Sequence, residues 1–77
     1  MLFNKFEFKY KNKKLHVYNY SKIIKLKKEQ IVLQYELGNL SINGDNIIIQ
    51  ELFKEYLVIS GDIKEILLIK DSIDDRS

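Results

Sequence analysis

Apolar and polar residues alternate with a period of two along most of this 77-residue chain. Because successive side chains of a β-strand point to opposite faces of a sheet, the alternation predicts strands with one buried face. Residues 47–49 are apolar on both faces, which predicts a central strand. Residues 50–57 also have helix-like apolar spacing, but two turns without a capping residue favour two strands joined by a corner. Strands are predicted over residues 6–10, 15–20, 22–27, 31–37, 47–49, 56–59 and 63–69, with a brief alternating strand over residues 40–42.

Glycine and asparagine mark the places where these strands are expected to turn. Asn43-Gly44 lies between two apolar alternations and predicts a hairpin, because a type I′ turn needs positive φ at both central residues. The glycines lack the spacing of a phosphate-binding loop and precede no predicted helix. In the last strand, a slip in the apolar spacing predicts a β-bulge near Lys64-Glu65. The residues predicted to form turns are Gly38, Asn39, Asn43, Gly44 and Gly61.

The chain also contains a weak internal repeat. After a shift of 25 positions, the apolar pattern of residues 15–33 falls on that of residues 40–58, which predicts two similar halves. The predicted fold is therefore all-β, an antiparallel meander of about seven short strands whose two halves form a small sandwich or barrel-like domain. This single domain is expected to occupy residues 1–70, followed by a polar C-terminal tail over residues 71–77.

Cysteine is absent, which excludes disulfides, thiolate metal sites and cysteine nucleophiles. A domain of this size buries only about 60–65% of its unfolded surface, so we expect it to associate with a protein partner or to form a homo-oligomer. Charges interrupt the first eight residues before a signal peptide's apolar segment can form, and no apolar run is long enough to span a bilayer. We therefore expect a soluble domain without a transmembrane segment of its own, and the absence of cysteine fits a cytoplasmic location.

No residue pattern predicts catalysis or a bound group. His16 is the only histidine, and the spacing of the sequence places no nucleophile or carboxylate beside it. The acidic residues of the tail lack the ligand alternation and the glycine of a calcium loop. We accordingly expect no enzymatic activity, no catalytic residue, no metal site and no cofactor.

Charge is distributed unevenly, because residues 1–38 carry a formal charge of +6 and residues 39–77 one of −4. In the basic half, strand alternation places a histidine and two tyrosines on the face opposite Leu15 and Val17. Tyrosine is enriched in protein interfaces, so this face is the predicted partner-binding surface. Its residues are His16, Tyr18 and Tyr20, flanked by Lys22 and Lys25.

The lysines and tyrosines of the basic half also fit an alternative function. A small basic β-barrel can bind single-stranded nucleic acid by stacking aromatic rings on the bases. Lysine predominates and arginine is nearly absent, so we prefer a protein partner and do not expect nucleic acid.

Several segments of the sequence resemble a known family. They are Leu15-His16-Val17-Tyr18-Asn19-Tyr20 with Lys22-Ile23-Ile24, Glu29-Gln30-Ile31-Val32-Leu33, Gly38-Asn39-Leu40-Ser41-Ile42-Asn43-Gly44, Ile47-Ile48-Ile49, and Tyr56-Leu57-Val58-Ile59-Ser60-Gly61-Asp62-Ile63 with Ile66 and Leu68. Across roughly residues 14–69, the chain resembles the YabP/YqfC family of small sporulation proteins of endospore-forming Firmicutes. The first segment is closer to the YqfC branch. The chain departs from the family's pattern at Asp45, where members usually have a basic or small residue.

The resemblance implies a non-enzymatic sporulation protein made in the mother cell. Such a protein would act as a β-rich interaction or assembly module at the forespore surface, peripheral to the forespore membrane. It implies a sporulation membrane protein as the partner, because genes of the YqfC type commonly neighbour one that encodes a larger sporulation membrane protein. It carries over no active-site residue.

Overall fold

The computed structural model describes residues 5–70, whose strands all belong to one antiparallel sheet. No helix occurs in this range, so the all-β prediction is confirmed. The strands number six rather than about seven, and the predicted polar tail lies outside the described residues. They are β1 (Glu7–Lys11), β2 (Lys14–Tyr18), β3 (Lys22–Leu26), β4 (Gln30–Tyr35), β5 (Gly38–Leu52) and β6 (Tyr56–Lys70), in the spatial order β1-β2-β6-β5-β4-β3.

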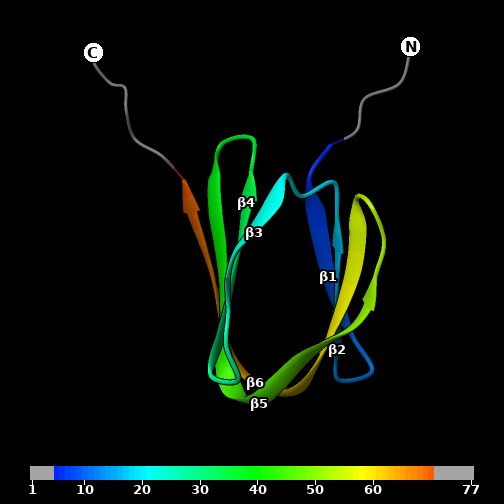
Figure 1. Cartoon of the computed structure of the whole chain (residues 1–77), viewed down its shortest axis with the longest axis vertical. Helices are drawn as coiled ribbons and strands as arrows, with labels where there is room; N and C mark the ends of the chain where they lie inside the picture. The colour runs from blue at the N-terminus through cyan, green and yellow to red at the C-terminus, as the bar shows by residue number, and fades with distance from the viewer. Residues whose placement is uncertain (1–4, 71–77) are drawn as a thin grey trace.

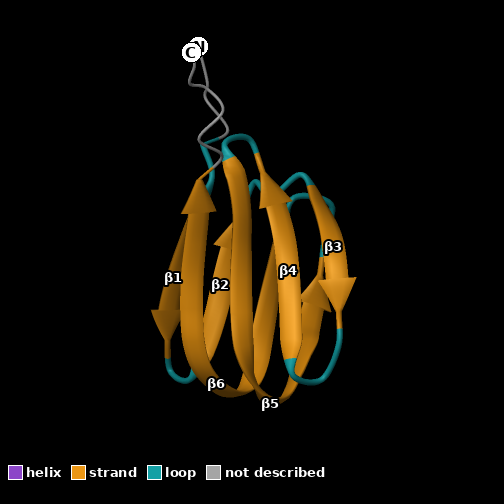
Figure 2. Ribbon diagram, turned by 90° about the vertical axis from the view of Figure 1, so that its left-hand side faces the viewer, coloured by secondary structure: helices purple, strands orange, loops and turns teal. Residues whose placement is uncertain are grey.

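The sheet is folded over into two layers, because the long strands β5 and β6 bend in the middle (Figure 1). The first layer contains β1, β2, the beginning of β6 and the end of β5. The second layer contains β3, β4, the beginning of β5 and the end of β6. Figure 2 shows β6, β5 and β4 side by side. The end strands β1 and β3 do not pair with each other, so the sheet is an open sandwich and not a closed barrel.

The bends lie at Gly44 and Gly61, where the sequence predicts turns. That prediction is wrong, because β5 and β6 each continue through their glycine and stay paired with each other. A Cβ atom on Gly44 would collide with the carbonyl oxygen of Asp62, and one on Gly61 would lie 2.5 Å from that of Asn46. Gly61 also has a φ of 118°, which side chains rarely adopt. Glycine is therefore needed where the two bends cross, and pairing along the strands overrides the local hairpin signal of Asn43-Gly44.

The tight turns lie elsewhere in the chain. Gly38 and Asn39 begin β5 instead of turning the chain, and Glu36-Leu37 form the connection, because Tyr35 pairs with Gly38. The positive φ values expected at Asn43-Gly44 occur at Asn12 and Lys13, with φ of 52° and 61°. These two residues join Lys11 to its partner Lys14, as in a two-residue hairpin of the I′ kind.

Two further predictions concern β5 and β6. The β-bulge near Lys64 is confirmed, because Asn43 pairs with Glu65 and Gly44 pairs with Ile63. The corner expected within residues 50–57 is also confirmed, since β5 ends at Leu52 and β6 begins at Tyr56. Residues 47–49 are not a central strand, because this part of β5 pairs only with β6 and Ile48 is 54% exposed.

The core fills the space between the two layers. In the first layer Leu15 of β2 lies opposite Ile59 of β6, and in the second Ile31 of β4 lies opposite Ile42 of β5. In this register β1 and β2 occupy in the first layer the positions that β3 and β4 occupy in the second. The beginning of β6 likewise corresponds to the beginning of β5. The halves are therefore related differently from the predicted shift of 25 positions, which aligned β2 with β5. The core cluster consists of Leu15, Val17, Tyr20, Ile31, Leu33, Leu40, Ile42, Ile47, Leu57 and Ile59.

Candidate interaction surfaces

Four ring side chains, His16, Tyr18, Phe53 and Tyr56, form an aromatic cluster on the outer face of the first layer. Tyr18 of β2 lies opposite Tyr56 of β6, and their rings stack with centroids 4.8 Å apart and an interplanar angle of 25°. The Phe53 ring lies 5.8 Å from that of Tyr56 at an angle of 11°. Nδ1 of His16 and the hydroxyl oxygen of Tyr56 form a hydrogen bond of 2.9 Å. Pairing of β2 with β6 thus orders four rings on one surface.

A basic groove adjoins the aromatic cluster. Lys9 lies opposite His16, and Lys11 lies opposite Lys14, so these lysines share the outer face with Tyr18. With Asn12 they line a groove of about 350 Å³. Burial raises the pKa of Tyr56, and its neighbours Tyr18 and Glu51 act in the same direction, so the phenol stays neutral at pH 7. The surface therefore combines uncharged rings with cationic side chains.

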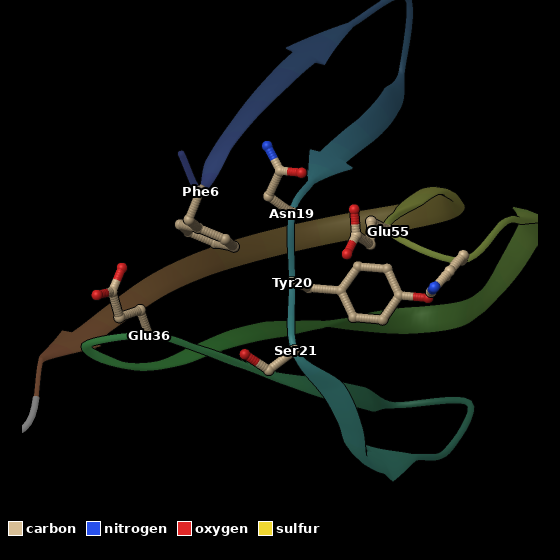
Figure 3. A pocket seen from close by; sticks show the side chains of 7 residues that line it. Phe6, Asn19, Tyr20, Ser21, Glu36 and Glu55 are labelled. Atoms are coloured by element: carbon tan, nitrogen blue, oxygen red, sulfur yellow. The ribbon is translucent and has the colours of Figure 1, made fainter. Parts of the chain in front are cut away.

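Tyr20 does not belong to this face, and the prediction that placed it there is wrong. Asn19 has a φ of 64°, which interrupts the strand alternation after Tyr18. As a result Tyr20 is only 8% exposed and packs in the core, where its hydroxyl donates a hydrogen bond of 3.0 Å to the carbonyl oxygen of Phe53. Figure 3 shows the Tyr20 ring pointing away from Phe6.

The segment around Tyr20 lines a pocket of about 340 Å³ at the connection from β2 to β3 (Figure 3). Backbone hydrogen bonds hold this connection, from Asn19 N–H to the Glu55 carbonyl at 2.5 Å and from Ser21 N–H to the Gln34 carbonyl at 2.7 Å. Residues 5–70 contain no group of three or more histidine, cysteine or acidic side chains placed to hold a metal ion. The two backbone hydrogen bonds join the connection to residues of both layers, so it links the layers over the core.

The predicted surface is only partly brought together. Lys22 and Lys25 lie on β3, opposite Gln34 and Val32 of β4, on the outer face of the second layer. The Lys25 ammonium donates a hydrogen bond of 2.8 Å to the side-chain oxygen of Gln30. Of the five predicted contact residues, only His16 and Tyr18 therefore lie together on the outer face of the first layer.

Phe53 and Tyr56 were missed by the sequence reasoning, because they join the cluster only through the pairing of β2 with β6. His16 and Tyr56 are 40 positions apart in the chain. The spacing of neighbouring residues cannot predict a contact between residues so far apart in the sequence. The one available signal was the corner between β5 and β6, which placed two aromatic residues beside a turn.

A second kind of candidate surface is formed by large apolar residues that are exposed to solvent, most of them along unpaired edges of the sheet. Among the described residues, every large apolar side chain that is exposed lies in an end strand, in a turn, or in a part of β5 or β6 that is paired on one side only. None lies in a stretch paired on both sides. These residues are Tyr10, Ile24, Leu26, Leu37, Ile48, Leu52, Phe53, Leu67, Leu68 and Ile69.

Within residues 5–70 no helix is long and apolar enough to cross a membrane. Comparison with known proteins gives one family. The model of the YabP family matches residues 10–73, without separating the YqfC branch from the others. No curated protein and no solved structure matches the chain. Because the family model covers most of the sequence, including the strands and bends described above, the chain belongs to the YabP family and is a sporulation-related protein.

Proposed function

We propose that this protein is a non-enzymatic interaction module of sporulation that acts in the mother cell at the forespore surface and binds a membrane-protein partner. Family membership supports the role in sporulation. The location and the kind of partner rest on the resemblance to YqfC-type proteins. The observation that carries the binding role is the aromatic cluster on the outer face of the first layer.

The aromatic cluster has the properties of a protein-binding anchor. Tyr18 and Tyr56 hold each other by stacking, and the hydrogen bond to His16 fixes Tyr56 further. Side chains ordered before binding lose little conformational entropy when a partner docks, which favours affinity. Tyrosine is also among the residues that dominate the binding energy of interfaces. Lysines of the adjoining groove would face acidic side chains on the partner and orient the encounter.

Replacing Tyr18 in the sporulating cell tests this function. Tyr18→Ser removes one stacked ring from the surface and leaves the core intact, so we expect unchanged folding. Loss of an aromatic anchor weakens binding by about 2 kcal/mol or more, roughly 30-fold. The measurement is the fraction of the protein that sediments with the forespore membranes, together with the yield of heat-resistant spores.

Lys22→Ala is the matched control, because Lys22 is exposed on the second layer, away from the aromatic cluster. We expect both readouts to stay at the unmodified level in this control. Circular dichroism of the purified variants checks that both are folded. Equal membrane association and equal spore yield for Tyr18→Ser and the unmodified chain would contradict the proposal.

A second candidate function, binding of single-stranded nucleic acid, is favoured by the basic groove beside stacked tyrosines. The closed barrel first expected for this function is absent, but an open sheet face with aromatic rings and lysines can also hold a strand. Affinity for a short oligonucleotide across a salt series distinguishes the two functions. A steep loss of affinity with salt supports nucleic-acid binding, and absence of binding at low salt rules it out.

A further inference from the structure

The end of β6 has an unpaired edge. β2 pairs with β6 only as far as Ser60, so Glu65–Lys70 is hydrogen-bonded to β5 on one side alone. β1 pairs with β2 and forms no ladder with β6, although the Tyr10 side chain of β1 borders a pocket with Ile63, Glu65 and Ile66. Among the described residues, no further backbone hydrogen bond reaches the segment. Its N–H and C=O groups on that side are therefore free to pair with another strand.

The side chains of this edge are apolar on both faces of the sheet. Leu67 and Ile69 project from the outer face, opposite Ser41 and Asn39 of β5, and are 43% and 50% exposed. Leu68 projects from the inner face, is 51% exposed, and borders a groove of about 340 Å³ whose walls include Phe6, Tyr35 and Leu37. No charge interrupts the four residues between Glu65 and Lys70.

The corresponding edge of β5 is protected. Its register is broken near Asp45 and again between Ile49 and Glu51, and β-bulges of this kind blunt a sheet edge. Glu51 adds a charge to the edge. The backbone N–H groups of Gly44 and Ile47 donate to the carbonyl oxygens of Glu29 and Lys28, at 3.0 and 2.9 Å. The end of β6, by contrast, has a continuous register and no charge between Glu65 and Lys70.

We propose that two copies of this chain pair through the free edges of β6, antiparallel and about a two-fold axis at Leu67. A two-fold axis normal to the sheet keeps every residue on its own face, so each residue must meet one of the same face. Centring on Leu67 places Leu67 opposite its own counterpart and Ile66 opposite Leu68, which joins apolar pairs at the centre, and it places Ile69 opposite Glu65 at each end. Centring on Leu68 would instead place Ile66 opposite Lys70, and centring on Ile66 would draw the bulged Lys64 into the ladder.

The contact joins the second layers of two copies into one continuous sheet. A second copy fits this edge because the apolar residues Ile66, Leu67 and Leu68 complement themselves in the antiparallel register. Five paired residues per copy, Glu65–Ile69, bury less than the ~800 Å² per partner of a standard interface, so the association is weak and depends on concentration. The outer face of the first layer is not involved. Self-association and partner binding at the aromatic cluster can therefore fail independently.

The absence of cysteine makes the proposal testable by cross-linking. Leu67→Cys places one thiol at the two-fold axis, and Ile48→Cys is the matched control, since Ile48 is similarly exposed on the β5 edge. Under mild oxidation we expect disulfide-linked dimers from Leu67→Cys and at least roughly tenfold fewer from Ile48→Cys. Dimers that form when the two variants are mixed, linking position 67 to position 48, would indicate head-to-tail pairing and overturn the two-fold arrangement.

Sedimentation provides a measurement that does not depend on disulfide geometry. The unmodified chain is expected to shift from monomer to dimer over roughly a hundredfold range of concentration. Leu67→Lys brings two like charges together at the axis and should weaken the dimer at least roughly tenfold, whereas Ile48→Lys should not change it. An unmodified chain that remains monomeric throughout, or equal effects of the two lysine variants, would overturn the proposal.

Discussion

The two longest strands share one architecture and differ in how their free edges are treated. β5 and β6 each have 15 residues, each bends at a glycine, and each passes from the middle of one layer to the edge of the other. The free edge of β5 is bulged, charged at Glu51 and bound by backbone groups of the connection between β3 and β4. The free edge of β6 has none of these features over Ile66–Ile69. β5 shows that a strand of this architecture can have a protected free edge. The free edge of β6 lacks that protection, so it is available for pairing.

The largest expected effect concerns the two bends, which both strands need equally. Gly44→Ala and Gly61→Ala should each lower the free energy of unfolding by more than about 3 kcal/mol, because the added Cβ meets backbone of the opposite strand. Urea unfolding measures the effect, with Ser60→Ala as a control that should stay within about 0.5 kcal/mol. A loss below about 1 kcal/mol at either glycine would mean that the bends can shift to accept a side chain.

An intermediate effect is expected when the protection of β5 is removed. Glu51→Val takes the charge from the β5 edge, so this edge should gain self-association. The test adds Glu51→Val to the Leu67→Lys variant, in which pairing through the β6 edge is prevented. Sedimentation across a concentration series then measures the fraction of dimer. We expect partial recovery of dimers. If the double variant stays monomeric, the bulges and backbone hydrogen bonds protect β5 without help from the charge.

The smallest effect concerns the corner that joins β5 to β6. Tyr20→Phe removes the hydrogen bond to the Phe53 carbonyl and should lower the free energy of unfolding by about 1 kcal/mol. Burial raises the pKa of Tyr20 above its ordinary value of 10.0, so the neutral phenol stabilises the fold. This stability is fully present below pH 10 and is lost as the pH rises through the folded-state pKa.

Unfolding measured at pH 8 and above pH 10 checks this sign. The unmodified chain should lose more stability between the two conditions than Tyr20→Phe, which has no phenol to ionise at this position. Parallel losses in the two chains would show that Tyr20 does not contribute to alkaline unfolding.

Local patterns in the sequence predicted those parts of the fold that depend on neighbouring residues. Period-two alternation identified the strands, and the slip in spacing located the bulge at Lys64. The hairpin predicted at Asn43-Gly44 does not form, because this local sequence pattern carries no information about which strand will pair alongside it. β6 runs beside β5 through this point, and the close approach of the Asp62 backbone to Gly44 requires the same residue type as a turn.

The candidate surface could be predicted only where the alternation held. His16 and Tyr18 share a face as expected, whereas the positive φ of Asn19 turns Tyr20 into the core. Asparagine adopts this conformation more readily than most residues, but its presence does not show that it will. The pairing of Tyr18 with Tyr56, and the unpaired side of β6, depend on which distant strands meet. Neither is encoded in local spacing.

Amide hydrogen exchange measured at two protein concentrations tests the central claim most directly, because it compares the two edges in one molecule. Every second amide of Glu65–Lys70 points away from β5, and these amides should exchange more slowly as the concentration rises. The amides of Gly44 and Ile47 should be protected equally at both concentrations, because they bond within the chain. Exchange along β6 that does not change with concentration would contradict pairing of two copies through this edge.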